Sequence, residues 1–151
     1  MEVLTAAGAG FLLAVLWFDL MFDVQVRRDP VDPGAVRAIA AYYRRVTTDA
    51  RPMNRLVALA MLGTLASIVV QVVTIATADT PWWSALALPL ALGPIVLAGT
   101  RTVPGAVRLG QRTAPGPEEL ALARRILADH LLCFAGIAGV LVVQILLAVT
   151  A

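Results

Sequence analysis

Residues 126–149 read ILADHLLCFAGIAGVLVVQILLAV, and this stretch decides the fold. It is long and apolar enough for one transmembrane helix, because about 20 apolar residues in an α-helix cross a hydrocarbon layer of about 30 Å. Three more stretches qualify or nearly qualify, at 3–22, 56–76 and 82–99. We therefore expect an all-α fold, a polytopic four-transmembrane-helix bundle that forms a single integral membrane domain over residues 1–151.

The composition supports this class and excludes most others. Of 151 residues, 60% are hydrophobic and only 15% are charged, and the mean hydropathy is +0.83. Soluble domains carry about half apolar and about a quarter charged residues. The strands of a membrane barrel would alternate apolar and polar residues, and this chain has no such alternation. The lipid bilayer is therefore the first partner that the sequence predicts.

All 12 basic residues are arginine, and they lie in two loops between the expected spans. Positive residues in short loops stay in the cytoplasm. We therefore predict a multi-pass protein of the cell membrane with both long Arg-rich loops in the cytoplasm and both termini outside. These arginines lie against the membrane without interleaved exposed aromatic residues, which argues against nucleic-acid binding.

An internal repeat relates the two halves of the chain. The pentapeptide PGAVR at 33–37 recurs at 104–108, and VVQ at 69–71 recurs at 142–144. Gly63 and Gly136 fall in register with the second match. The matches keep their order, at offsets of 71 and then 73. We expect two duplicated helix hairpins of the same orientation, related by a pseudo-two-fold axis along the membrane normal.

Two kinds of side chain indicate how the spans pack. Ala6, Gly10 and Ala14 form a small-residue stripe on the first span, and Ala135 with Gly139 does the same on the fourth. Small residues let helix backbones approach closely inside a membrane. Gln71 and Gln144 occupy equivalent positions of the repeat, so we predict an interhelical hydrogen bond between them. Their alternative role is to line a small polar cavity that opens outward.

The first long loop is expected to contain an amphipathic helix at about 33–49. Asp32 can cap it, and Pro33 suits its first position. Apolar residues then recur at helical spacing, with arginines on other faces: Val36, Ile39, Ala40, Tyr43 and Val46 against Arg37, Arg44 and Arg45. The first interpretation is a helix on the inner membrane surface whose arginines reach anionic headgroups. The alternative is a lid or docking helix over a site between the spans.

Polar residues gather near the cytoplasmic ends of the spans. The expected topology places six of them in one membrane layer: Asp19, Asp23, Asn54, Arg55, Asp129 and His130. Ionisable residues inside spans are costly and are candidates for function. Asp19 and Asp23 lie one helical turn apart, so they share a face of the first span.

Two interpretations of this layer remain open. In the first, Asp19, Asp23 and His130 are catalytic acid–base groups, or hold a divalent metal together with Asp129, since carboxylate and imidazole ligands suit iron, manganese or zinc. In the second, Asp19 or Asp23 forms an ion pair with Arg55 or another loop arginine, and His130 bonds locally. Ion pairs near the membrane boundary cost far less than charges at its centre.

Three functions follow from these observations. The first is a membrane subunit or helix-packing and interaction module, working as a homo-oligomer or within a larger membrane complex. The second is a membrane-embedded, metal-dependent oxidoreductase-like enzyme that acts on a lipophilic substrate through Asp19, Asp23 and His130. The third is a small proton- or cation-coupled transporter that uses the same carboxylates.

Overall fold

The computed structural model describes residues 2–74, 81–112 and 116–150, and every regular element among them is helical. The helices are α1 (Glu2–Asp23), α2 (Pro33–Arg44), α3 (Arg51–Thr74), α4 (Ala87–Leu97), α5 (Val103–Gly110) and α6 (Pro117–Thr150). Short 3₁₀ segments cover Val24–Arg27 and Trp82–Leu86, and π-helical turns cover Arg45–Asp49 and Ala98–Thr102.

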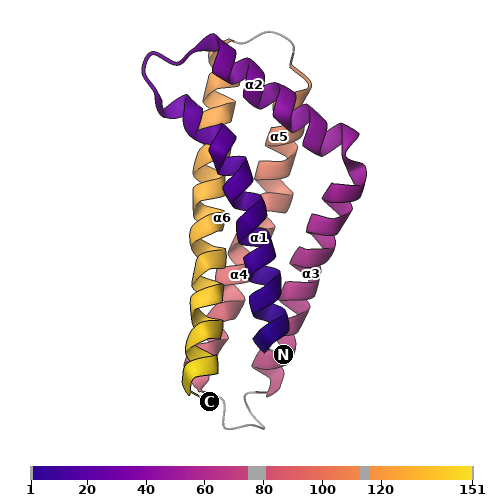
Figure 1. Ribbon diagram of the computed structural model, residues 1–151, viewed down its shortest axis with the longest axis vertical. Helices are drawn as coiled ribbons and strands as arrows, with labels where there is room; N and C mark the ends of the chain where they lie inside the picture. Colours follow the sequence, from indigo (N-terminus) through magenta and orange to yellow (C-terminus); the bar gives the residue numbers. More distant parts are fainter. Residues whose placement is uncertain (1, 75–80, 113–115, 151) are drawn as a thin grey trace.

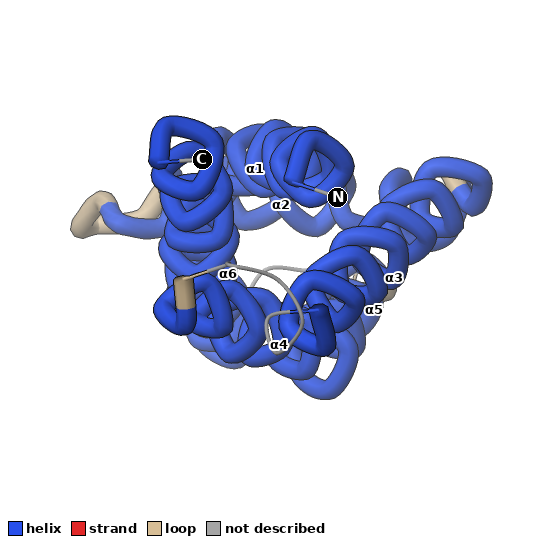
Figure 2. The backbone as a smooth tube through the Cα atoms, turned by 90° about the horizontal axis from the view of Figure 1, so that it is seen from below, coloured by secondary structure: helices blue, strands red, loops and turns tan. Residues whose placement is uncertain are grey.

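Four helical rods build the body of the molecule. Each is long and apolar enough to cross a membrane: Glu2–Arg27, Pro52–Thr74, Trp82–Gly110 and Pro117–Thr150. Figure 2 shows them around the long axis, where α1 packs between α6 and α3, and α4 completes the ring between the same two neighbours. The prediction of an all-helical bundle with four helices long and apolar enough to span a membrane is therefore confirmed, and these helices are typical of a multi-pass membrane protein.

The expected spans differ from the helices at their ends, and the third and fourth differ most. The third rod does not stop at 99 but continues through a π-helical turn into α5, as far as Gly110. The fourth begins at Pro117 rather than 126, with Glu118 and Glu119 in its first turn, where the helix dipole favours anions. Residues 75 and 76 of the second expected span lie outside the described residues.

Helix α2 lies across one end of the bundle, which we call the capped end, whereas both chain termini are at the other end (Figure 1). Asp32 begins this helix as expected, because its carboxylate accepts a hydrogen bond from the Gly34 amide at 2.8 Å. Ile39 and Tyr43 are buried against apolar residues of α1, α5 and α6. The apolar face of α2 therefore packs on protein, which favours a docked helix over one that lies only on lipid.

Close backbone approach joins α4 to α6. A Cβ added at Gly136 would lie 2.8 Å from the Leu90 carbonyl oxygen, and one at Gly139 would lie 3.1 Å from a Leu90 methyl group. By contrast, a Cβ at Gly10 would meet no heavy atom within 4 Å. Gly10, at the centre of the stripe of Ala6, Gly10 and Ala14, therefore makes no close helix contact inside the bundle, contrary to the expectation for this position.

The predicted glutamine pair is confirmed. The Gln71 Nε2 donates to Gln144 Oε1 at 3.0 Å, and Gln144 Nε2 lies 3.3 Å from Gln71 Oε1. These amides lie on α3 and α6, which face each other across the bundle without close backbone contact. Gln144 is 2% exposed. The pair thus satisfies its own polar groups inside an apolar core.

Candidate functional site

The capped end holds a buried group of ionisable side chains from three helices. Asp19 and Asp23 lie on the last turns of α1, His130 lies on α6, and Tyr42 and Tyr43 lie near the end of α2. Because α1 packs along α6 and α2 crosses both, these residues meet in one place. We call these five residues the Asp–His–Asp network. Its centre is closed to solvent: Asp23 is 0% exposed and His130 is 7% exposed.

The imidazole of His130 lies between two carboxylates. Its Nδ1 is 2.7 Å from Asp23 Oδ2, which is hydrogen-bonding distance, and its Nε2 is 3.8 Å from Asp19 Oδ2. Both predicted aspartates therefore turn toward the histidine, as the first interpretation of the polar layer requires. The alternative pairing with Arg55 does not occur, since the described residues contain no ion pair to that exposed side chain.

Two tyrosines extend the network onto the cap helix. The Tyr43 hydroxyl donates to Asp23 Oδ1 at 2.7 Å and lies 3.4 Å from His130 Nδ1. The Tyr42 hydroxyl donates to Asp19 Oδ1 at 2.7 Å, and its ring stacks on Phe22 with centroids 4.1 Å apart. Sequence reasoning placed Tyr43 only among the apolar residues of α2 and assigned no role to Tyr42. In each aspartate, one carboxylate oxygen accepts a hydrogen bond from a tyrosine and the other oxygen faces the imidazole of His130.

The environment keeps both tyrosine hydroxyls protonated. Burial raises the pKa of Tyr43 far above its ordinary value of 10.0, and the Asp23 and Asp19 carboxylates raise it further. Burial also raises the pKa of Tyr42, with Asp19 as its main charged neighbour. Both effects disfavour a tyrosinate anion. The two hydroxyls therefore remain hydrogen-bond donors to the carboxylates across the physiological pH range.

An alkaline titration tests this environment. The chain has two tyrosines, both in the network, so the tyrosinate absorbance near 295 nm reports on no other site. We expect the folded protein to show no tyrosinate signal at pH values where an exposed tyrosine, with a pKa of about 10, is already ionised. Because the pKa values of both tyrosines are raised in the folded protein, their neutral hydroxyls contribute fully to its stability below about pH 10. This contribution is lost as the pH rises above that value.

The Asp23→Asn variant tests whether the Asp23 carboxylate raises the pKa of Tyr43. Removing this carboxylate should let Tyr43 ionise at a lower pH than in the wild type, whereas Asp49→Asn, at an exposed position, should leave the curve unchanged. Ionisation of both tyrosines near pH 10 in the folded wild type would show that they are not buried beside carboxylates.

Asp129 belongs to a separate pair, although it adjoins His130 in the sequence. Its carboxylate accepts two hydrogen bonds from Arg101, one of them from Nε at 2.9 Å, and Thr102 Oγ1 lies 3.5 Å away. Its side chain is 2% exposed. The expectation that Asp129 joins the histidine site is therefore wrong: adjacent residues point about 100° apart on a helix, and this direction leads to Arg101.

The other predicted polar residues lie outside the network. Asn54 donates to the Thr47 carbonyl oxygen at 3.1 Å, which ties the start of α3 to the turn after α2. Gln71 and Gln144 pair at mid-bundle, as described above. The predicted polar layer is thus divided into a histidine network, an Arg101–Asp129 pair and a local contact of Asn54.

The donor arrangement gives the predicted divalent-metal site no support. Within the described part of the chain, no group of three His, Cys, Asp or Glu residues is arranged to hold a metal ion. The two carboxylates approach different nitrogens of one imidazole, so they do not point at a common position beside it. The arrangement is suited instead to holding and passing protons among the imidazole, the two carboxylates and the tyrosine hydroxyls.

Comparison with known proteins gives no identification. No family model matches the chain, and neither the curated proteins nor the solved structures contain a match to it.

Proposed function

We propose that the protein is a small membrane transporter that carries protons and that the Asp–His–Asp network is its proton-binding site. The observation that carries this proposal is the imidazole of His130 enclosed between the carboxylates of Asp19 and Asp23 inside the bundle. Ionisable residues within membrane spans are functional candidates by default, and chains of carboxylates and histidines serve as proton relays in pumps and transporters.

The orientation that we propose gives this site access to cytoplasmic protons. Positive residues favour the cytoplasmic side, and the arginine-bearing segments flank the capped end. Both termini then face outward. The exposed arginines of the amphipathic α2, Arg37 and Arg44, would contact anionic headgroups while its apolar face covers the network.

We also propose that the bundle arose by duplication of a helix hairpin. The two PGAVR copies fall at the start of α2 and within α5, and these two helices pack against each other. Gln71 and Gln144, equivalent in the repeat, bond to each other across the bundle. A pseudo-two-fold axis along the bundle would relate α1 to α4 and α3 to α6, which accounts for both contacts.

This duplication supports a functional role for the network. Under the repeat offsets of 71 and 73, the positions equivalent to Asp19, Asp23 and His130 are Leu90, Pro94 and Val57. The repeat makes the α3–α4 interface the counterpart of the α1–α6 interface. Its three equivalent positions are apolar, so this interface packs without ionisable residues at those positions. Buried ion pairs often stabilise a fold no more than apolar residues of similar volume do. Packing alone does not explain why one interface keeps three ionisable residues.

The geometry suggests how a proton would act. Each carboxylate fastens the cap helix by accepting a tyrosine hydrogen bond, and each faces the same imidazole. Taking up a proton on a carboxylate weakens it as an acceptor, and moving a proton onto the imidazole strengthens its attraction to both carboxylates. The protonation state of the network is thereby linked to how firmly α2 is held against α1 and α6.

Reconstituted vesicles with a trapped pH-sensitive dye test this function. With an imposed pH gradient and valinomycin to balance charge, the wild type should dissipate the gradient faster than protein-free vesicles. Asp23→Asn should reduce the rate to the protein-free level, and Asp49→Asn should match the wild type because this residue is exposed and outside the network. An equal rate for Asp23→Asn and the wild type, or no wild-type rate above background, would reject the proposal.

A membrane subunit or helix-packing module is the second candidate. It is favoured by the outward position of Gly10, which lies between Ala6 and Ala14 and where an added Cβ would meet no heavy atom within 4 Å. A homo-oligomer or a larger complex would use this face. Crosslinking in bilayers should then give an oligomer that Gly10→Leu abolishes, with the fold retained. A monomer at all protein-to-lipid ratios would argue against self-association.

A further inference from the structure

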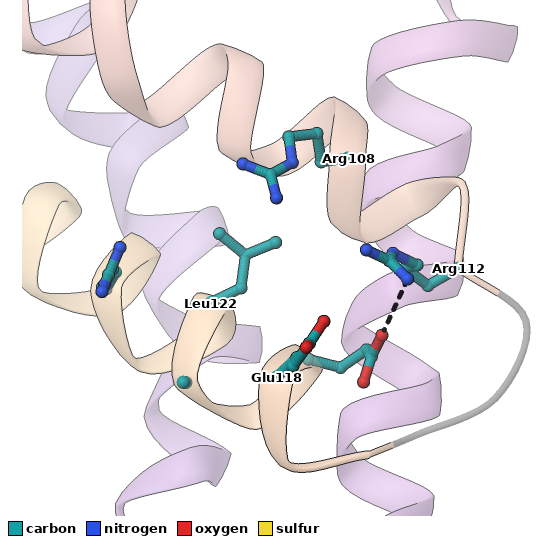
Figure 3. A pocket seen from close by; sticks show the side chains of 7 residues that line it. Arg108, Arg112, Glu118 and Leu122 are labelled. Atoms are coloured by element: carbon teal, nitrogen blue, oxygen red, sulfur yellow. Dashed lines mark ion pairs between the residues drawn. The ribbon is translucent and has the colours of Figure 1, made fainter.

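Two neighbouring hollows lie between α5 and the first turns of α6, near the capped end. Their volumes are about 370 and 340 Å³, within the range of about 300–1,000 Å³ that is common for small-ligand sites. They share Arg108, Leu122 and Arg125 in their walls. Figure 3 shows Arg108 reaching from α5 into the first hollow above Leu122 of α6.

Two of the shared residues, Arg108 and Arg125, are cationic and have no ion-pair partner among the described residues. Nearby, Arg112 lies 3.5 Å from Glu119, and Arg101 pairs with Asp129. Neither Arg108 nor Arg125 forms an ion pair with any residue that the structure describes. The second hollow holds three arginines and one carboxylate, so its net charge is +2 (3 − 1). An anion is therefore the ligand that this site would bind.

The residues that line the two hollows indicate which anion would bind, namely a phosphate group. Guanidinium groups bind phosphate oxygens in a bidentate manner, and basic pockets beside transmembrane helices bind lipid phosphates. Leu122, Ile126 and Pro104 line the second hollow next to the arginines. Such apolar surface beside a cationic centre fits the glycerol and upper acyl region of a phospholipid, or it can cover the edge of a free phosphate group.

We propose that Arg108 and Arg125 form a binding site for a phosphate group, supplied by an anionic phospholipid headgroup or by free phosphate. The site is separate from the Asp–His–Asp network and does not depend on its function. It gives α5 and α6 a common anionic ligand at the membrane surface.

Native mass spectrometry of the full chain tests this site, with phosphatidylglycerol as the anionic probe and phosphatidylcholine as the reference lipid. The Arg108→Gln/Arg125→Gln variant should retain about tenfold less phosphatidylglycerol, because it loses hydrogen bonds between charged groups. Arg27→Gln/Arg28→Gln removes the same charge from exposed positions outside both hollows and should stay within about twofold of the wild type. Circular dichroism of each variant verifies the helical fold.

Competition with inorganic phosphate separates the two sources. If excess phosphate displaces the lipid, the site binds free phosphate groups, whereas lipid retained against excess phosphate identifies a headgroup site. Either result supports the assignment when the Arg108→Gln/Arg125→Gln loss is present. Equal lipid retention by that variant and the wild type, or an equal loss in the Arg27→Gln/Arg28→Gln control, would overturn it.

Discussion

Alanine in place of Asp23 is expected to lower the free energy of unfolding by about 3–5 kcal/mol, the usual cost of removing one partner from a buried ionic group. Asp23 is 0% exposed and accepts hydrogen bonds from Tyr43 and His130. Its loss leaves a hydroxyl and an imidazole without their acceptor in an apolar surrounding. Reversible denaturation in mixed micelles, followed by circular dichroism, measures the change.

Two further variants make this result interpretable. Asp49→Ala, at an exposed position, should change the free energy of unfolding by no more than about 0.5 kcal/mol. The triple variant Asp23→Leu/Tyr43→Phe/His130→Leu removes the polar partners together and should recover most of the stability lost in Asp23→Ala. If Asp23→Ala were as stable as the wild type, the buried contacts of this carboxylate would not be present in the folded protein.

Gly110→Ala is expected to loosen the cap helix. A Cβ at this position would lie 2.7 Å from the backbone nitrogen of Arg44 and 2.9 Å from its Cα, so only a shift of α2 against α5 can make room. Overpacking of this kind costs about 1–3 kcal/mol. Because α2 carries Tyr42 and Tyr43, the same shift should lengthen their bonds to the carboxylates and lower the pH at which they ionise.

Gly105→Ala is the matched control on the same helix. Its Cβ would lie 3.6 Å from the nearest atoms, which belong to Ile126 and Leu122, so the contact is an ordinary one. Replacing glycine by alanine within a helix gains up to about 1 kcal/mol in propensity. Gly105→Ala should therefore be at least as stable as the wild type. Equal stability of the Gly110 and Gly105 variants would show that α2 and α5 do not approach as closely as described.

Apolar patterning predicted the helical architecture, because a span must be long and continuous to cross the membrane. The start of α2 followed from Asp32 and Pro33, whose capping chemistry is local. The Gln71–Gln144 contact was predicted from the matching VVQ segments, and the structure contains it. These features depend on local chemistry or on matching segments, and both are visible in a sequence.

The partners of the ionisable residues were harder to predict. Asp19, Asp23 and His130 were expected in one layer, but the direction of each side chain depends on how the helices rotate against each other. Asp129 was grouped with its neighbour His130, although the two face different helices. Arg101 was assigned to a loop because the third span was expected to end at 99, whereas the helix continues past it.

The same geometry changes the order of the functional hypotheses. From the sequence, a packing module came first, because the spans carry small-residue stripes and the chain contains no strong catalytic motif. With both carboxylates directed at His130, a proton-binding role becomes the better supported proposal.

The central claim is that this network binds and releases a proton. The chain has one histidine, so ¹⁵N-histidine labelling gives the NMR signals of His130 alone in lipid bilayers. Across the pH range in which the protein stays folded, we predict a reversible change in the protonation of this imidazole, together with an Nδ1 signal typical of a hydrogen bond to a carboxylate. Asp23→Asn should abolish that hydrogen-bond signature, and Asp49→Asn should preserve it. An imidazole that keeps one protonation state throughout this range in the folded protein, or that is unaffected by Asp23→Asn, would contradict the claim.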